Sequence, residues 1–369
     1  MDRSQETAVK LDRLRSFIAE HDLPGVLLRS RANFAWLTGG GLSYIDASSE
    51  KGVGSLLVTA EHLFFVANNI EAQRFVDEEL DGLGSPQVIE YPWYTDESEM
   101  EAIRKVMGNG VPAVDLGDGG EPYPEAIKGL RTPLVDAEIE RYRELGKLAT
   151  VLTEGVCHRI APGMSEDDVV AMTRHAFAER GVRVPVLLVA ADERIELRRH
   201  PISKGRRIER RVMLVVCAEA HGLWVNLTRL VNLEPIAAEL AMKHEAVCRI
   251  DATVNDATRP GRTLGEIFAE LVEAYEANGF ADQWQYHHQG GSTGYAGRDA
   301  FATPTSDVVV QADQAFAWNP SITGTKCEDT MLVGADGLAW LTEPGEGWPV
   351  VEVEHAGRTY RRAGILARA

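Results

Sequence analysis

The chain contains 369 residues, of which 44% are hydrophobic and 25% are charged. These proportions are typical of a globular protein, and the length favours two domains. The formal net charge of −18 argues against general binding to nucleic acid, because an acidic surface repels a phosphate backbone.

The N-terminal segment is charged and has no apolar signal core. The sequence has no run of about 18 apolar residues, so we expect a cytoplasmic protein without a membrane span. Its four cysteines are far apart and form no Cys-x-x-Cys pair: Cys157, Cys217, Cys248 and Cys327. We expect them to be reduced and mostly buried.

The first 130 or so residues are predicted to form a small α/β domain. Residues 11–21 have the pattern of an amphipathic helix, and residues 24–28 that of a buried strand. Residues 56–58 and 63–66 indicate a hairpin, and residues 71–80 a second helix. Strands that alternate with helices are typical of an α/β domain.

A domain boundary is predicted near residue 132. The polar stretch 117–123 and the pair Thr132-Pro133 are typical of a linker. We therefore expect one domain over residues 1–132 and a second over residues 133–369.

The second domain contains an internal repeat. Residues 160–182 align with residues 258–280 at an offset of 98 residues, so that Pro162-Gly163 falls on Pro260-Gly261. Each Pro-Gly turn leads into an amphipathic helix that ends at a glycine.

The sequence around each copy also matches. A helical stretch precedes each copy and strand-rich sequence follows it, which gives repeat units of 138–231 and 236–341. Two such units predict a pseudo-symmetric α+β domain, and ligand sites commonly lie between the halves of such domains. The basic run 204–211 is expected to be a solvated loop before a strand.

Four motifs occur in the order and spacing of a known family. They are RANFAWLTGG (31–40), EIERYRELGKLA (138–149), Thr228-Arg229 and CEDT (327–330). The chain thereby resembles the pita-bread family of methionine aminopeptidase, aminopeptidase P, prolidase and creatinase. The resemblance implies a pita-bread α+β domain after a smaller creatinase-type α/β domain. It also implies a homodimer, in which the segment with Arg31, Trp36 and Tyr44 either reaches the partner or packs internally.

The resemblance bears directly on metal binding. Active peptidases of the family hold two metal ions with two aspartates, a histidine and two glutamates. The matching positions here are Val215 or Val216, Asn226, Gly291, Asn319 and Glu328. A shift of the alignment by a few residues would place Cys217 or Glu219 at the first position. One certain carboxylate cannot hold two divalent ions, so we expect no metal cofactor and disfavour a true Xaa-Pro metallo-aminopeptidase. A single metal held by Glu328, His287 and a cysteine stays open.

Creatinase, which needs no metal, suggests other roles for the remaining residues. His200 matches its proton-transferring histidine, and Glu328 matches one of its substrate-holding glutamates. The alternatives are that His200 lies on the surface and that Glu328 is a structural carboxylate paired with Arg229.

Arg298 falls on His200 at the repeat offset, so the two are expected to face each other. An arginine there suggests a ligand with a carboxylate. The alternative is a salt bridge from Arg298 to Asp299 or Asp329.

Tyr286, His287 and His288 precede a glycine-rich segment whose N–H groups could bind an oxyanion. Adjacent strand residues point to opposite faces, so at most one histidine should enter the pocket, and His287 aligns better with the family. The expected substrate-binding residues are Arg298, His287, Asn226, Asn319, Thr228, Arg229 and Tyr286.

The leading hypothesis is a metal-independent hydrolase, or a lyase, that cleaves a C–N bond in a small zwitterionic molecule. Creatinase and ectoine hydrolase illustrate the substrate class. His200 would activate water or protonate the leaving nitrogen, Arg298 would bind the carboxylate, and Glu328 would bind the cationic end. The alternative is an inactive pita-bread pseudo-peptidase that binds a peptide or protein.

Overall fold

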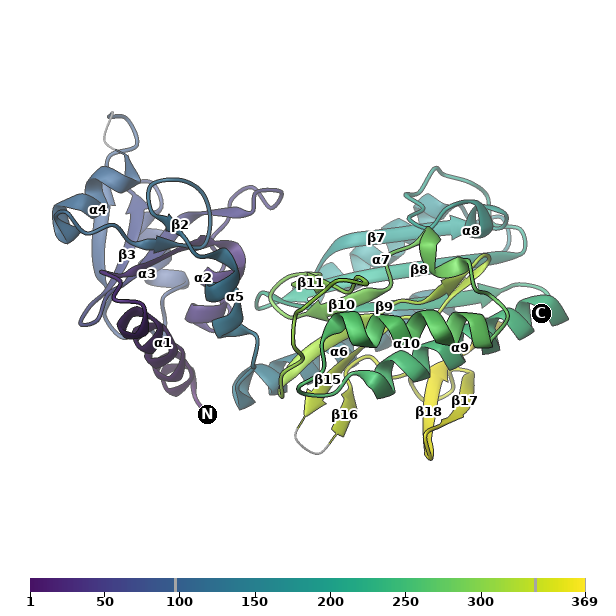
Figure 1. Cartoon of the computed structure of the whole chain (residues 1–369). Helices are drawn as coiled ribbons and strands as arrows, with labels where there is room; N and C mark the ends of the chain where they lie inside the picture. Colours follow the sequence, from purple (N-terminus) through teal and green to yellow (C-terminus); the bar gives the residue numbers. More distant parts are fainter. Residues whose placement is uncertain (96–97, 335–336, 369) are drawn as a thin grey trace. The chain divides into compact units, whose positions relative to one another are not determined.

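The computed structural model describes residues 1–95, 98–334 and 337–368 (Figure 1). The chain divides into two compact units. The first comprises Met1–Arg141 and His221–Leu223, and the second Tyr142–Ala220 and Trp224–Ala369. The division falls inside a long helix, so the bounds 1–132 and 133–369 stay a prediction.

The first unit is built on a six-stranded sheet with the strand order β4-β3-β2-β1-β5-β6. The strands are β1 (Val26–Ser30), β2 (Lys51–Val58), β3 (Leu63–Asn68), β4 (Gln87–Tyr91), β5 (Ala113–Val114) and β6 (Glu121–Pro122). The helices are α1 (Arg3–Glu20), α2 (Arg31–Thr38), α3 (Ala72–Glu78), α4 (Glu99–Met107) and α5 (Pro124–Arg131). The expected hairpin is present, because β2 and β3 pair antiparallel.

Two details differ from the sequence-based expectations. Helix α1 begins at Arg3 and not at residue 11, because Asp2 and Gln5 form a capping box that starts the helix earlier. The boundary segment around residue 121 contains the short strand β6. Trp36 is fully buried within this unit.

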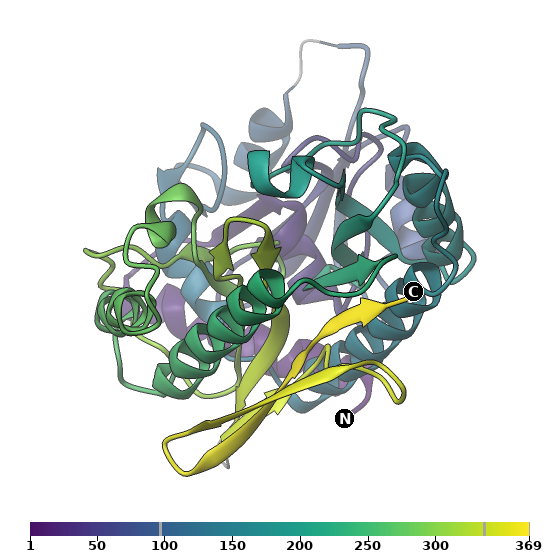
Figure 2. The same ribbon diagram turned by 90° about the vertical axis from the view of Figure 1, so that its right-hand side faces the viewer.

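The second unit contains two similar halves (Figures 1 and 2). The first half comprises α6 (Asp136–Cys157), α7 (Glu166–Ala178), β7 (Arg183–Ala191), α8 (Arg194–Leu197), β8 (Arg211–Ala220) and β9 (Leu223–Asn232). The second half comprises α9 (Ala238–Ala257), α10 (Leu264–Ala277), η1 (Gln283–Tyr286), β10 (Gly290–Thr293), β11 (Ala300–Phe301), β12 (Gln314–Trp318), β13 (Ser321–Ile322), β14 (Thr325–Lys326), β15 (Asp329–Gly334) and β16 (Gly337–Trp340). A C-terminal segment adds β17 (Val350–His355), β18 (Arg358–Ala363) and β19 (Ile365–Ala367).

Equivalent hydrogen bonds relate the two halves. The N–H of Gly163 donates to the Ile208 carbonyl, and the N–H of Gly261 donates to the Val310 carbonyl, both at 2.9 Å. The two glycines have φ values of +87° and +88°, a left-handed conformation that glycine adopts without strain. The same turn therefore positions α7 and α10.

Each half contributes its own sheet to the second unit. The sheets have the orders β19-β9-β8-β7 and β11-β10-β12-β15-β16. Helices α9 and α10 pack against each other, and the β17–β18 hairpin lies beside α9 in Figure 2. The apolar core under these helices includes the large side chains of Tyr275, Phe316 and Trp318.

The two halves meet where β9 runs beside the start of β15. The N–H of Thr228 donates to the Glu328 carbonyl at 3.0 Å, and the N–H of Asn226 donates to Thr330 Oγ1 at 2.7 Å. This pairing brings the two sequence motifs Thr228-Arg229 and Glu328-Asp329 together.

Two surface expectations can be compared directly with the structure. In the basic run, Lys204, Arg206, Arg207 and Arg210 are exposed in the loop before β8, as expected. Among the described residues, no helix is both long and apolar enough to cross a membrane.

Candidate functional site

Glu328 lies at the centre of the candidate site and is buried. Its Oε2 accepts from Thr228 Oγ1 at 2.6 Å and lies 2.7 Å from Lys326 Nζ. Its Oε1 lies 3.2 Å from Arg298 Nη2. Burial raises the pKa of Glu328, but the charges of Lys326 and Arg298 outweigh burial and lower that pKa to about 2.

These contacts correct three expectations. Arg298 pairs with Glu328 and not with Asp299 or Asp329, and Glu328 does not pair with Arg229. Both carboxylate oxygens of Glu328 already have partners, so the cationic end of a substrate would compete there with Lys326 and Arg298. Lys326 was not among the residues predicted from the sequence, although its spacing of two residues from Glu328 in an extended segment places both side chains on one side.

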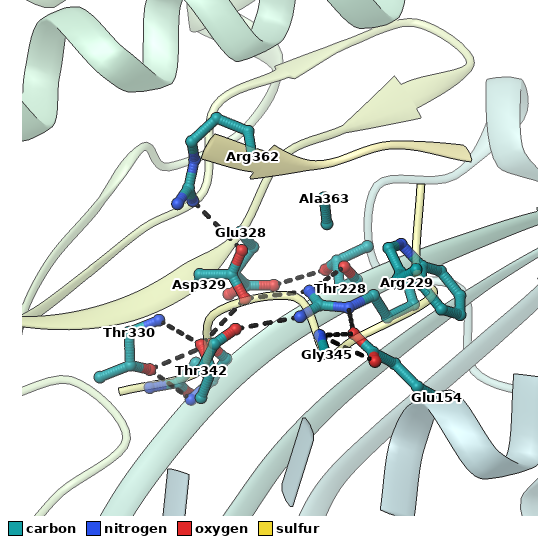
Figure 3. Close-up of polar contacts among 12 residues, drawn as sticks. Glu154, Thr228, Arg229, Glu328, Asp329, Thr330, Thr342, Gly345, Arg362 and Ala363 are labelled. Carbon is teal, nitrogen blue, oxygen red and sulfur yellow. Dashed lines mark hydrogen bonds and ion pairs between the residues drawn. The ribbon is translucent and has the colours of Figure 1, made fainter. Parts of the chain in front are cut away.

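Arg229 belongs to a buried structural network (Figure 3). Its Nε donates to Glu154 at 2.8 Å, its Nη1 to Asp329 at 2.9 Å, and its Nη2 to the Thr342 carbonyl at 3.0 Å. This corrects the expectation that Arg229 binds substrate, because its guanidinium is fully buried and its donors hold α6, β9 and β15 together.

Three histidines form a cluster near Glu328. His200 Nε2 lies 3.0 Å from His287 Nε2, so one nitrogen donates and the other accepts. The His287 and His288 rings stack with their centroids 4.4 Å apart, and the His200 and His288 centroids are 5.4 Å apart. The expectation that only one of the adjacent histidines faces the site is therefore wrong. They lie between η1 and β10 and not in a pleated strand.

Burial and the neighbouring cations lower the pKa values of the three histidines. Burial, followed by Lys326, lowers the pKa of His287 to about 2. Burial, followed by Arg298, lowers the pKa of His288 to about 4. The pKa of His200 is also lowered by burial and then by Lys326, although its side chain reaches solvent.

Several buried polar atoms at the site lack a protein partner. Within the described part of the chain, no hydrogen-bond partner contacts Asn226 Oδ1, Asn319 Oδ1 or Arg298 Nε. Asn226 and Thr228 alternate along β9 and so share the face toward Glu328. Buried polar groups normally have partners, so these atoms are available to a ligand or to water. Tyr286 is 61% exposed at the end of η1.

The sequence of residues 140–335 matches the profile of metallopeptidase family M24. The chain belongs to this family. The match confirms the resemblance to the pita-bread proteins, and the expected α+β fold with a preceding α/β domain is confirmed as well. The M24 family is a family of hydrolases, so the family match supports the broad class of hydrolase.

Proteins of similar length resemble this M24 chain. It is 20% identical over 361 residues to the putative dipeptidase YkvY of Bacillus subtilis strain 168, covering 90% of this chain and 97% of the relative. The structure of dipeptidase PepE from Mycobacterium ulcerans is similar, with a TM-score of 0.77, 18% identity and coverages of 93% and 97%. The Xaa-Pro dipeptidase from Bacillus anthracis gives a TM-score of 0.75, 18% identity and coverages of 91% and 97%. At these identities the structures show the fold alone.

The residues at the positions that the sequence resemblance assigns to the two metal ions differ from the ligands of the active peptidases. Gly291, which matches the histidine ligand, has a φ of +150°, and a Cβ there would lie 2.1 Å from the Ala300 carbonyl oxygen. Asn226 and Asn319 offer neutral oxygens, and Glu328 already faces two cationic side chains. Such a donor set cannot balance two dications.

The other metal arrangement considered from the sequence also fails. Among residues 1–95, 98–334 and 337–368, the potential ligand atoms that converge belong to His200, His287 and His288. Glu328 and a cysteine do not join His287 in such a group. Cys217 lies close enough for Glu328 to raise its thiol pKa, after burial, to about 12, so this thiol stays protonated. Glu219 pairs with Arg183 at 3.0 Å.

Proposed function

We propose that this chain is a metal-independent M24 hydrolase that cleaves a C–N bond in a small molecule carrying a carboxylate. The observation that carries the proposal is the contact between His200 and His287 beside the Arg298–Glu328–Lys326 cluster. A pair of neutral imidazoles that share a proton is suited to proton transfer, and an arginine and a lysine around one carboxylate leave a net positive site.

His200 performs the proton transfers in this proposal. Its unprotonated nitrogen takes a proton from water as the water oxygen attacks the carbon of the C–N bond. The C–N bond then breaks, and the same proton passes to the leaving nitrogen. His287, whose Nε2 lies 3.0 Å away, holds the His200 ring in place and fixes which nitrogen carries the proton.

Arg298 binds the carboxylate of the substrate through its free Nε, and Asn226 and Asn319 accept hydrogen bonds from the substrate's polar hydrogens. The bound carboxylate also offsets the positive charges that lower the pKa of His200. Substrate binding therefore makes His200 a stronger base when it is needed. No residue is assigned to a cationic end, because Glu328 is occupied.

The test measures turnover after the removal of metal ions. Dipeptides, amidines, ureas and cyclic amino acids are screened with protein that has been treated with a chelator. We expect C–N cleavage that survives chelation and falls about 10²- to 10⁴-fold in His200→Ala, the usual contribution of a general acid–base group. His175→Ala removes an exposed histidine on α7 and serves as the matched control. Activity that is lost on chelation and restored by manganese would overturn the proposal.

A second candidate function is a pseudo-peptidase that binds a peptide or protein. The lowered pKa of His200, caused by burial and then by Lys326, favours this alternative, because a less basic imidazole is a poorer general base. In that case dipeptides with a free carboxylate bind without turnover, and Arg298→Ala weakens their binding while His200→Ala does not. Isothermal titration calorimetry on the two variants separates the two functions.

A further inference from the structure

We propose that His200, His287 and His288 form a binding site for one divalent transition-metal ion such as Zn²⁺, separate from the two-metal site of the M24 peptidases. One ligand atom from each of the three side chains lies within 4.8 Å of the others. Three imidazoles with an open fourth position are a common zinc ligand set. The proposal concerns metal binding and does not depend on the proposed hydrolase function.

The geometry is close to what a metal ion requires. Nitrogens around a tetrahedral zinc ion lie ~3.4 Å apart, because each Zn–N bond is about 2.0–2.1 Å. His200 Nε2 and His287 Nε2 are 3.0 Å apart, so a modest opening of this pair and an approach of His288 admit an ion. His200 is exposed, which provides access from solvent.

The histidines also have unused binding capacity. His287 is 8% exposed, and its Nδ1 has no partner among the described residues. His288 Nδ1 is likewise buried and unpartnered within the described part of the chain. A buried ring nitrogen without a partner is costly, and an ion held by His288 Nδ1 would supply one. An ion held by His287 Nε2 leaves His287 Nδ1 as it is.

The neighbouring charges set the strength of binding. Glu328 attracts a cation, whereas Lys326 and Arg298 repel it, so one positive charge remains in excess. We therefore expect weaker binding than at a zinc site ringed by carboxylates, and we expect removal of Lys326 to strengthen it. If the proposed hydrolase function also holds, the bound ion takes His200 and His287 out of proton transfer and inhibits the enzyme.

The experiment uses the full chain and the metal alone. Chelator-treated protein is titrated with Co²⁺, whose visible absorption reports tetrahedral nitrogen ligands, and then with Zn²⁺ in competition. We expect one ion per chain. Affinity should fall at least about tenfold in His288→Ala, since loss of even a supporting group costs that much. His62→Ala removes an exposed histidine of the first unit and should leave the affinity unchanged.

Lys326→Met distinguishes metal binding from a purely structural role of the histidines, because it keeps all three histidines and changes only a neighbouring charge. We expect it to tighten Co²⁺ binding at least about threefold, because one repelling charge is gone. Circular dichroism and melting curves confirm that each variant is folded. The proposal would be overturned if the protein bound no ion, or if His288→Ala left the affinity unchanged. It would also be overturned if several ions bound and no histidine variant affected them. None of these results depends on finding a substrate.

Discussion

At the scale of single residues, Lys326 changes the interpretation of the site most. Its ammonium lies 2.7 Å from Glu328, the one carboxylate at the positions that match the family's metal ligands. A side-chain cation thus faces the carboxylate that would otherwise face a metal ion. Thr228 adds a neutral hydroxyl contact to the same carboxylate, and the matching positions Asn226 and Asn319 carry buried neutral amides.

Replacement of Lys326 should be costly for stability. In Lys326→Met we expect the free energy of unfolding to fall by about 3 kcal/mol, because a buried carboxylate loses a partner and keeps only Arg298. Urea denaturation of both proteins measures the difference. Lys243→Met breaks a solvent-exposed pair with Glu239 and should change the free energy by less than about 0.5 kcal/mol. Equal effects of the two substitutions would contradict this account of Lys326.

Most members of the site can be predicted from the sequence, but their pairings cannot. His200, His287, Arg298 and Glu328 could be selected because their positions match motifs with known spacing. Which carboxylate meets which arginine depends on the crossing of β9 and β15, which no local pattern encodes. The stacking of His287 and His288 depends on the irregular segment after η1, where the alternation rule for strands does not apply.

At the scale of elements, buried charges hold the second unit together. Glu154 on α6, Asp329 on β15 and Asp251 on α9 share the guanidinium groups of Arg229 and Arg362. Three carboxylates thus face two cations, so one carboxylate is expected to keep a proton near neutral pH. Figure 3 shows the part of this network around Arg229.

We expect Asp251 to be the carboxylate that holds this proton. Burial raises its pKa to about 7, although Arg362 opposes the shift, and Cys248 and Asp329 add to it. The folded chain therefore binds a proton that the unfolded chain has lost above about pH 4, so this contribution to stability falls as pH rises toward 7. In Asp251→Asn, which cannot ionise, we expect a flatter dependence of the melting temperature on pH between 5 and 8. An unchanged slope in this variant would assign the proton to another group.

The elements themselves were well predicted. Both Pro-Gly turns, both capped helices and the β2–β3 hairpin follow from local sequence signals, and the structure contains them. The sequence could not predict that β19 pairs parallel with β9, because that contact joins residues more than 130 positions apart. Long-range pairing is selected by packing and not by local preference.

At the scale of the whole molecule, the charge balance affects stability. The chain has 56 acidic and 38 basic side chains, so its surface repels itself at neutral pH. We expect the melting temperature at pH 7 to rise when NaCl increases from about 10 mM to about 0.2 M, because salt screens charges beyond about 10 Å. Near the isoelectric point of about 5.0 this dependence should largely disappear. A melting temperature that falls with salt at pH 7 would show that attractive pairs outweigh the repulsion.

The conformation of Gly291 limits how this site could change. A side chain at this position would collide with the Ala300 carbonyl oxygen of β11, and one at Gly290 would lie 2.2 Å from the Ala317 carbonyl oxygen of β12. A histidine in place of Gly291 therefore cannot recreate a two-metal peptidase unless β11 shifts. Two-metal catalysis would require several simultaneous substitutions. Directed evolution toward a new activity should therefore start from the histidine cluster.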